Sequence, residues 1–201
     1  MIYDFVHTCN TYDKKNYSKE YFRATRCPKC PAVGRFNMHS CYKRYAILFV
    51  DGNIEIEFME IKRIICESCG TTHAVMPGDI IPYSALTLYV FIYVLASYYI
   101  KKTPALNIAK ELGFSYQLVY LLVAVFLMHR NHIEQQIRET APEDIPAALS
   151  ECGILLRIER SGIDFQRDYI KTNRRPCFMS KFFDSTGAPP IGIYCHIMGT
   201  T

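Results

Sequence analysis

The stretch CESCGTTH (residues 66–73) decides the fold of this chain. Its Cys-x-x-Cys pair is half of a metal site, a redox dithiol, or two ordinary buried cysteines. A second pair, CPKC (residues 27–30), precedes it with 35 residues between the two. Zinc prefers four soft ligands in a tetrahedron, and each Cys-x-x-Cys turn offers two thiolates from one side. The spacing therefore predicts one structural Zn²⁺ bound by Cys27, Cys30, Cys66 and Cys69.

Other interpretations of the same cysteines stay open. A rubredoxin-type iron site uses the same four thiolates, and independent buried or redox cysteines would show the same spacing. His39, Cys41 and His73 are weaker candidates for ligands, because they do not share the symmetry of the two pairs. A closed four-thiolate site has no vacant coordination position, so we expect it to hold the fold together and not to catalyse hydrolysis.

The residues between the two pairs are predicted to form a β-hairpin. The segments YKRYAILFV (42–50) and IEIEF (54–58) flank the sequence Asp-Gly-Asn. This is a strong tight-turn signal, because Gly52 and Asn53 tolerate positive φ. A hairpin with one Cys-x-x-Cys turn at each end is the layout of a zinc ribbon.

The second strand of this hairpin has an alternating pattern. Ile54, Ile56 and Phe58 alternate with glutamates, which predicts one buried face and one solvated face. We expect the strand to run on to Ile65 across a bulge near Met59.

From Pro82 onward the apolar period becomes helical, and three helices are predicted at about 82–101, 103–113 and 115–138. The charge-free stretch from Ile80 to Ile100 is long enough to cross a bilayer. Its proline and its tyrosines near the midpoint favour a buried core helix instead, because tyrosine gathers at membrane interfaces. A membrane span is the weaker alternative.

The predicted fold class is α+β. An N-terminal zinc ribbon is followed by a helical helix-turn-helix domain and a short irregular tail of strands and loops from residue 154. The expected boundaries are a basic N-terminal segment (1–26), the ribbon (27–79), the helical domain (80–140), and a connector with a mixed tail (141–201).

The second and third predicted helices have the spacing of a helix-turn-helix. Ala109 stands where the helices cross, Gly113 supplies the turn, and Val119 packs back on the first helix. Ile108 and Leu112 fill the remaining inward positions. An ordinary helical hairpin would show similar residues, so this alternative stays open.

The start of the third helix supplies the candidate residues for reading DNA bases. A helix in the major groove contacts base edges through polar side chains near its N-terminus. An apolar run, LLVAVFLM (121–128), follows them and is typical of a helix that is buried or shared with another subunit. A homo-oligomer formed through residues 115–128 is therefore the alternative. The candidate base contacts are Ser115, Tyr116, Gln117 and Tyr120.

Positive charge is concentrated before and within the hairpin. Between residues 14 and 44 there are five lysines and four arginines against one glutamate, a net charge of +8 in a chain whose total is +4. Such a segment is expected to meet a polyanion, although a solvated loop face would show the same charge. The candidate phosphate contacts are Lys14, Lys15, Lys29, Arg35, Lys43 and Arg44.

The order of these elements resembles a group of uncharacterised bacterial proteins. In these proteins a zinc ribbon precedes a helix-turn-helix, as in the N-terminal regions of insertion-sequence transposases. The resemblance covers about residues 27–130. Its most specific marks are the Cys-x-x-Cys pairs, Thr72-His73, and Ile-Pro-Tyr-Ser (81–84). It implies DNA binding linked to mobile elements.

Catalysis is not expected. A transposase nuclease domain needs three carboxylates that converge on Mg²⁺, and the roughly 60 residues after Thr140 are too few for that fold. We expect their acidic side chains to be surface charge and caps.

The cysteine content also suggests a compartment. Nine cysteines is an odd number, and the N-terminus lacks the pattern of a secretory signal, which favours a reducing cytoplasm. The leading hypothesis is a cytoplasmic, zinc-dependent DNA-binding protein without nuclease activity. The alternatives are a protein-interaction adaptor built on the ribbon and a small membrane-anchored protein.

Overall fold

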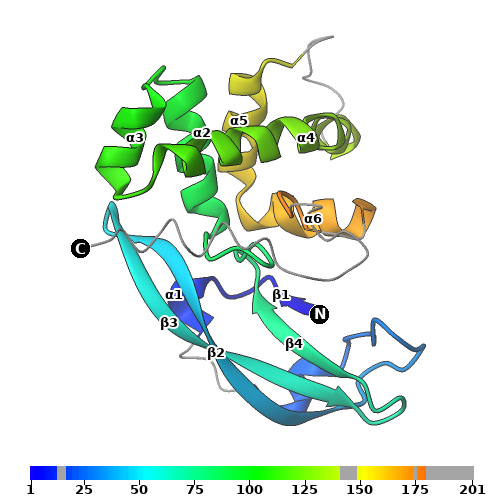
Figure 1. The fold of residues 1–201 in the computed structure, drawn as a ribbon. Helices are drawn as coiled ribbons and strands as arrows, with labels where there is room; N and C mark the ends of the chain where they lie inside the picture. Colours follow the sequence, from blue (N-terminus) through cyan, green and yellow to red (C-terminus); the bar gives the residue numbers. More distant parts are fainter. Residues whose placement is uncertain (13–16, 141–148, 174–175, 180–201) are drawn as a thin grey trace.

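The computed structural model describes residues 1–12, 17–140, 149–173 and 176–179. Within these ranges a four-stranded sheet lies below a layer of helices (Figure 1), and the α+β class is confirmed. Neighbouring strands are antiparallel except for the first pair, in which β1 runs parallel to β4. In the order β1-β4-β3-β2, the strands are Ile2–Asp4, Thr72–Pro77, Asn53–Cys66 and Phe36–Val50.

Strands β2 and β3 form one long hairpin. Their pairing runs from Phe36 with Cys66 at one end to Val50 with Asn53 at the other. Asp51 and Gly52 form the turn with φ of 50° and 82°, the mirror-image geometry that suits the twist of a two-residue hairpin. The predicted turn is confirmed in place, but positive φ falls on Asp51, and Asn53 already belongs to the strand.

The predicted bulge near Met59 is wrong. The register shift lies on β2 between Met38 and Ser40, opposite Arg63 and Ile64. At this point the buried positions of β3 change from odd to even numbers, since its buried residues are Met59, Ile61, Ile64 and Cys66. An extra residue on the partner strand accommodates that change of face.

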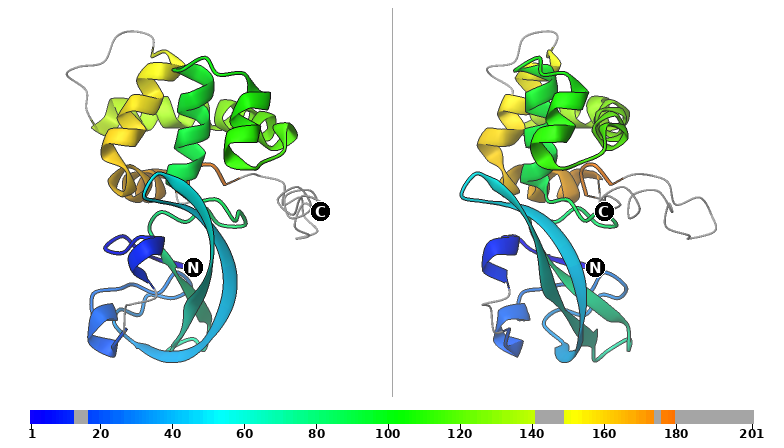
Figure 2. Two further views of the ribbon diagram at one scale, coloured as in Figure 1. Left: turned by 90° about the vertical axis from the view of Figure 1, so that its left-hand side faces the viewer. Right: turned by 60° about the vertical axis from the view of Figure 1, so that its left-hand side comes forward.

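The N-terminal segment fills the hollow of the curved hairpin (Figure 2). It contains the short helix α1 (Cys9–Tyr12) and the 3₁₀ helix η1 (Lys19–Phe22). Their side chains Tyr12 and Phe22 join a core with one face of the sheet. The curved hairpin therefore buries this face on the chain's own N-terminus.

A second core lies within the helical layer. Helix α2 is central and is contacted by α3, α4 and α5, while α6 packs on α4 and α5. Leu95, Phe126 and Ile158 are fully buried in this core. The helices are α2 (Leu88–Tyr99), α3 (Ala105–Leu112), α4 (Tyr116–Thr140), α5 (Glu151–Ser161) and α6 (Ile163–Asn173).

Two of the three predicted helices are confirmed almost to the residue, and α2 begins later than predicted. Before it, Ile80 bridges to Thr87, and Leu86 bridges in parallel to Ile47 of β2. The backbone N–H of Ile47 donates to Ala85 O at 2.7 Å and that of Thr87 donates to Ile47 O at 3.1 Å. The chain therefore turns back at Pro82 and Tyr83, where the N–H of Ser84 donates to Ile81 O at 3.2 Å, and residues 85–87 are held against the hairpin, so the helix begins only after them.

The prediction of strands and loops after residue 154 is wrong as far as Asn173. Ser150 caps α5, because its hydroxyl accepts a bond from the N–H of Gly153 at 3.2 Å. Ile154 and Ile158 lie one turn apart on the buried face of α5, and Phe165 and Tyr169 do the same in α6. The rest of the expected tail, residues 180–201, lies outside the described residues, as does most of the predicted connector.

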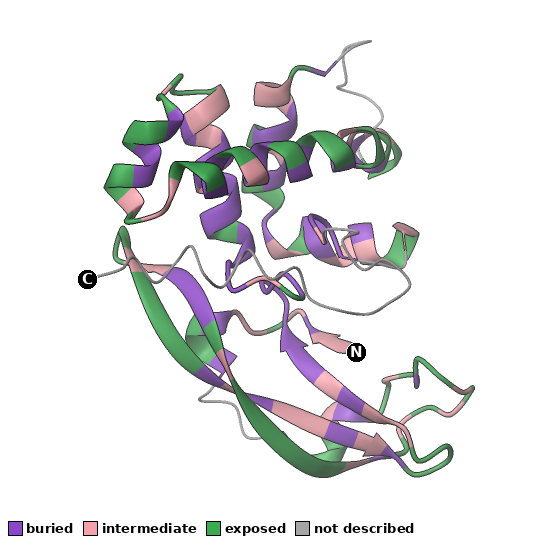
Figure 3. Cartoon of the chain, in the orientation of Figure 1, coloured by how far each residue is buried: buried purple, intermediate pink, exposed green. Residues whose placement is uncertain are grey.

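The predicted buried face of β3 is also wrong. Ile56 and Phe58 are 55% and 62% exposed, and long exposed stretches mark both strands in Figure 3. The helical layer covers this face only near the tip of the hairpin, where Phe49 packs edge-on against Tyr93 of α2. Alternation indicates which residues share a face but not how far a covering layer extends.

In the described parts of the chain no single helix has the length and apolar character needed to span a membrane. Helices α3 and α4 meet that requirement only when taken together, and they are bent by 114° at the break between them.

Candidate metal centre

Two turns, each closed by the same type of backbone hydrogen bond, carry the four cysteines. In the first turn the N–H of Cys27 donates to the carbonyl of Ala32 at 2.8 Å, and in the second the N–H of Cys66 donates to the carbonyl of Thr71 at 3.0 Å. In both turns the bond joins the first cysteine to the residue five positions later. Gly70 follows the second pair with φ of 67°, a conformation that favours glycine. The two pairs thus share one closing bond, while their backbones differ at the fifth position, where Gly70 corresponds to Pro31.

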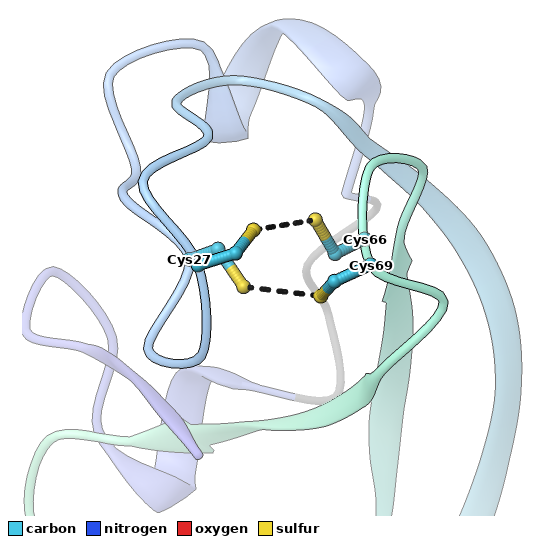
Figure 4. Close-up of side chains that lie close together, drawn as sticks. Cys27, Cys66 and Cys69 are labelled. Atoms are coloured by element: carbon cyan, nitrogen blue, oxygen red, sulfur yellow. Dashed lines mark hydrogen bonds between the residues drawn. The ribbon is translucent and has the colours of Figure 1, made fainter.

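The structure brings the four sulfurs together, each within 4.8 Å of the others. Figure 4 shows the two turns facing each other, with Cys27 Sγ 3.8 Å from Cys69 Sγ and Cys30 Sγ 3.7 Å from Cys66 Sγ. A tetrahedron with metal–sulfur bonds of about 2.3 Å has edges of about 3.8 Å. Two edges therefore have the length that a four-thiolate metal ion requires, and the group has the geometry to hold one.

The electrostatics of the cluster also fit a cation. The hydroxyl and the N–H of Thr71 hydrogen-bond to the sulfur of Cys69 and lower the pKa of this thiol to about 6. The N–H of Ala32 acts in the same direction on Cys30, but burial and the neighbouring thiols outweigh it and raise the pKa of Cys30 to about 12. Four adjacent thiolates repel one another, and a divalent ion at their centre removes this conflict.

Two groups stabilise the sulfur of Cys27 without being part of the four. The N–H of Lys29 donates to it at 3.4 Å, and His73 Nε2 also lies 3.4 Å from it. His73 is 3% exposed and sits edge-on to the ring of Phe36. The sequence names His73 only as a weaker ligand; its buried position on β4 identifies it as a partner of a ligand instead.

The other cysteines lie apart from the cluster where they are described. Cys41 is exposed on β2, Cys9 and Cys177 are buried, and Cys152 donates to the carbonyl of Tyr99. His39, the other weak candidate, is exposed at the bulge of β2. Cys195 lies outside the described residues.

The candidate phosphate-binding residues are spread along the hairpin. Lys29 lies in the first cysteine turn, and Arg35 precedes β2; both are exposed. Lys43 is exposed in the middle of β2, while a guanidinium nitrogen of Arg44 donates to Ser84 O at 2.6 Å. The remaining two, Lys14 and Lys15, lie outside the described residues.

The candidate base-contacting residues lie far from this charge. β2 has 15 residues and spans about 45 Å between the cysteine end and the helical layer. Tyr116, Gln117 and Tyr120 are exposed at the start of α4. Ser115 has a structural task, because its hydroxyl accepts a bond from the N–H of Leu118 at 3.2 Å and so caps α4. The structure therefore places the exposed start of α4 apart from the basic residues at the cysteine end, Lys29 and Arg35.

Helices α3 and α4 meet at a bend of 114° across the three residues from Gly113 to Ser115. Gly113 has φ of 66° and closes α3, with its N–H bonded to Ala109 O. Ala109 and Val119 are buried where the helices meet, as the spacing predicts. The two helices therefore form a sharply bent pair around a short glycine turn.

Three of the C-terminal carboxylates that the structure describes form ion pairs on the surface. Glu151 pairs with Arg130 at 3.2 Å, and Asp164 pairs with Arg167 at 2.6 Å. Asp168 also pairs with Arg167. These contacts agree with the surface roles that we expect for this part of the sequence.

Comparisons with known proteins give one match. Residues 27–107 match a family model described as a domain of unknown function (DUF6431). The matched segment begins at the first cysteine of the cluster and ends within α3. The chain matches no curated protein and no solved structure.

Proposed function

We propose that this chain is a zinc-dependent DNA-binding protein, in which a ribbon-like sheet carries a structural Zn²⁺ and a helix-turn-helix contacts the duplex. Zinc is the most common ion in tetrahedral four-thiolate sites, and such a site is closed to substrate. Elemental analysis of the purified protein is expected to give one zinc per chain. Iron with a visible charge-transfer band would instead indicate a rubredoxin-like centre.

The observation that carries DNA binding is the relationship between α3 and α4. Their 114° bend leaves the first turn of α4 exposed, with Tyr116, Gln117 and Tyr120 at the surface. In a helix-turn-helix the start of the second helix enters the major groove. Basic residues at the cysteine end, such as Lys29 and Arg35, are suited to a second contact with the DNA backbone.

A binding assay on mixed-sequence duplex DNA tests this proposal. Affinity is expected to fall steeply as salt rises, because phosphate contacts release counterions. Gln117→Ala is expected to weaken binding by about 1–3 kcal/mol. Gln135→Ala changes the same residue type at an exposed site near the other end of α4 and is expected to leave binding unchanged. Equal losses in the two variants, or no duplex binding at low salt, would contradict the proposal.

Oligomerisation through α4 is a second candidate function, because the exposed face of this helix continues as apolar surface. Leu127 and Met128 are 50% and 54% exposed. By contrast, Leu121 and Val125 pack against the helical core and are not available to a partner. If α4 joins two subunits, Leu127→Lys should dissociate the oligomer in light scattering, whereas Gln135→Lys should leave it intact.

The setting of this function is proposed from the resemblance. A ribbon followed by a helix-turn-helix suggests a protein that belongs to mobile elements or regulates them. It would work in the cytoplasm and have no nuclease activity of its own. Incubation of the protein with supercoiled plasmid and Mg²⁺ is expected to give no nicked product. Nicking activity that co-purifies with the chain would refute the proposed absence of nuclease activity.

A further inference from the structure

A groove of about 430 Å³ lies beside β2, the edge strand of the sheet. Residues 42–45 and Phe58 of the hairpin line it on one side. Pro82 and Tyr83, from the turn before α2, line it on the other. Its volume falls within the range of about 300–1,000 Å³ that is usual for ligand sites.

Aromatic side chains dominate this groove. Tyr45 and Phe58 are paired directly across the hairpin, with ring centroids 4.3 Å apart. They are 43% and 62% exposed, on the part of the face that the helical layer leaves bare. Tyr42 and Tyr83 add two further aromatic rings to the lining. Exposed aromatic rings on a sheet form a platform on which unstacked bases pack.

Tyr83 is held in a costly conformation at this site. Its φ of 62° lies in the left-handed region, where a bulky residue costs of order 1–3 kcal/mol. Arg44 fixes the next residue, because its guanidinium donates to Ser84 O. Backbone strain of this kind gathers at binding sites. Tyr83 and Ser84 belong to the Ile-Pro-Tyr-Ser sequence, which neither the metal cluster nor the α3–α4 pair uses.

The charge of the groove selects a polyanion. Lys43 and Arg44 both line it, and none of the nine described lining residues is acidic. An apolar peptide offers no anion to these two cations, whereas phosphates next to stacked bases match both the charge and the aromatic rings. Duplex DNA keeps its base faces stacked and hidden, so the aromatic platform fits a single strand.

We propose that this groove binds single-stranded DNA, with bases packed on Tyr45 and Phe58 and phosphates against Lys43 and Arg44. This deepens the proposed function, and it rests on that function only for the choice of DNA as the polyanion. The groove and the exposed start of α4 are separate surfaces, so each is testable alone.

Fluorescence anisotropy with a short labelled oligo-dT and with a duplex separates the two surfaces. Tyr45→Ala and Phe58→Ala are each expected to weaken oligo-dT binding about 5- to 150-fold and to leave duplex affinity unchanged. Gln117→Ala is expected to do the reverse. Leu156→Ala, at an exposed leucine on α5, is the neutral control. Metal content and circular dichroism confirm that each variant is folded.

Two further readouts test the contacts themselves. Lys43→Gln is expected to reduce the salt slope of oligo-dT binding by about 0.7, as loss of one single-strand phosphate contact requires. An oligonucleotide carrying 5-iodouracil is expected to cross-link, under light, to the peptide that contains Tyr45 or Phe58.

Each outcome decides between the two proposals. Oligo-dT binding that depends on Tyr45 and Phe58, with no duplex binding, supports the groove and refutes the helix-turn-helix function. Absent oligo-dT binding at low salt, affinity unchanged by both aromatic substitutions, or cross-links only to α4 would overturn the groove proposal and leave a peptide as the occupant to test.

Discussion

His73 Nε2 lies 3.4 Å from Cys27 Sγ, on the inner side of the cysteine cluster. Burial, reinforced by nearby positive charge, lowers the pKa of His73, so its ring is neutral at pH 7. One ring nitrogen can then donate to the Cys27 thiolate, and this bond would orient the sulfur toward a metal ion held by the cluster.

Replacing His73 with phenylalanine should separate this hydrogen bond from packing. The ring of Phe keeps the edge contact with Phe36, while the N–H is lost. Zinc affinity, measured by competition with a chelating dye, is expected to fall about 10- to 100-fold. His39→Phe, at an exposed position on β2, serves as the control. Equal zinc affinities in the two variants would show that His73 contributes packing and no hydrogen bond to the metal site.

The metal ion is expected to hold the sheet together. Cys66→Ser should abolish metal binding and lower the melting temperature, because Cys66 is fully buried between both turns. Cys41→Ser removes an exposed thiol of the same hairpin and should stay within about 0.5 kcal/mol of the original chain. Metal content and thermal denaturation followed by circular dichroism measure both. A Cys66→Ser chain that melts like Cys41→Ser would rule out a structural metal.

Asp4 should make stability depend on pH. Burial alone would raise the pKa of its carboxyl, but hydrogen bonds from Tyr17, Tyr21, the N–H of Val6 and His7 outweigh burial and hold it below 3.8. A carboxyl whose pKa is lower in the folded chain stabilises it above the unfolded pKa, and this stabilisation is lost as pH falls through the folded pKa.

The variant Asp4→Asn measures this contribution. It is expected to cost about 2–3 kcal/mol at pH 7, because bonds to a charged acceptor are lost. The difference from the original chain should shrink as pH falls from 5 to about 3, and urea denaturation at each pH measures it. Acid also releases metal from thiolates, but both chains share that effect and the subtraction removes it. A difference that does not change with pH would contradict this assignment.

Gly34 is expected to be essential to the first cysteine turn. Its φ is 69°, and a Cβ at this position would lie 2.5 Å from the carbonyl oxygen of Arg23. Gly52 has φ of 82° but open space around it. Gly52→Ala should therefore cost about 1 kcal/mol, and Gly34→Ala about 3 kcal/mol or more. Urea denaturation measures the free energy of unfolding of both variants. Similar losses would show that the positive φ alone, and not the contact with Arg23, sets the cost.

Sequence spacing predicts the parts of this fold that depend on local chemistry. Two Cys-x-x-Cys pairs at this spacing favour one shared site, and Gly113 between apolar helices favours a turn, so the cluster and the α3–α4 bend are foreseeable. Helix α5 is missed because Ile154 and Ile158 offer only two turns of periodicity, among glycines and charges that suggest a loop. Ser150, which caps α5, can be recognised as a cap in the sequence only if a helix is already expected after it.

Other features depend on tertiary coverage and leave no signal in one sequence. Alternation groups Ile54, Ile56 and Phe58 on one face, yet only Ile54 reaches the helical layer. The contact between His73 and Cys27 requires knowledge that β4 returns beside the first cysteine turn. Likewise, Tyr83 joins Tyr45 at one groove only because residues 85–87, which follow its turn, are bonded to Ile47 of the hairpin.

Consecutive residues of β2 pack into two different hydrophobic cores. Ala46 and Leu48 point into the core shared with the N-terminal segment, whereas Ile47, between them, points into the core of the helices. Because β2 contributes side chains to both cores, the sheet cannot unfold without removing contacts from the helical core, and the reverse also holds. We therefore expect the chain to unfold as one cooperative unit, so that removing a metal ion from the cysteine end would also destabilise the helices at the other.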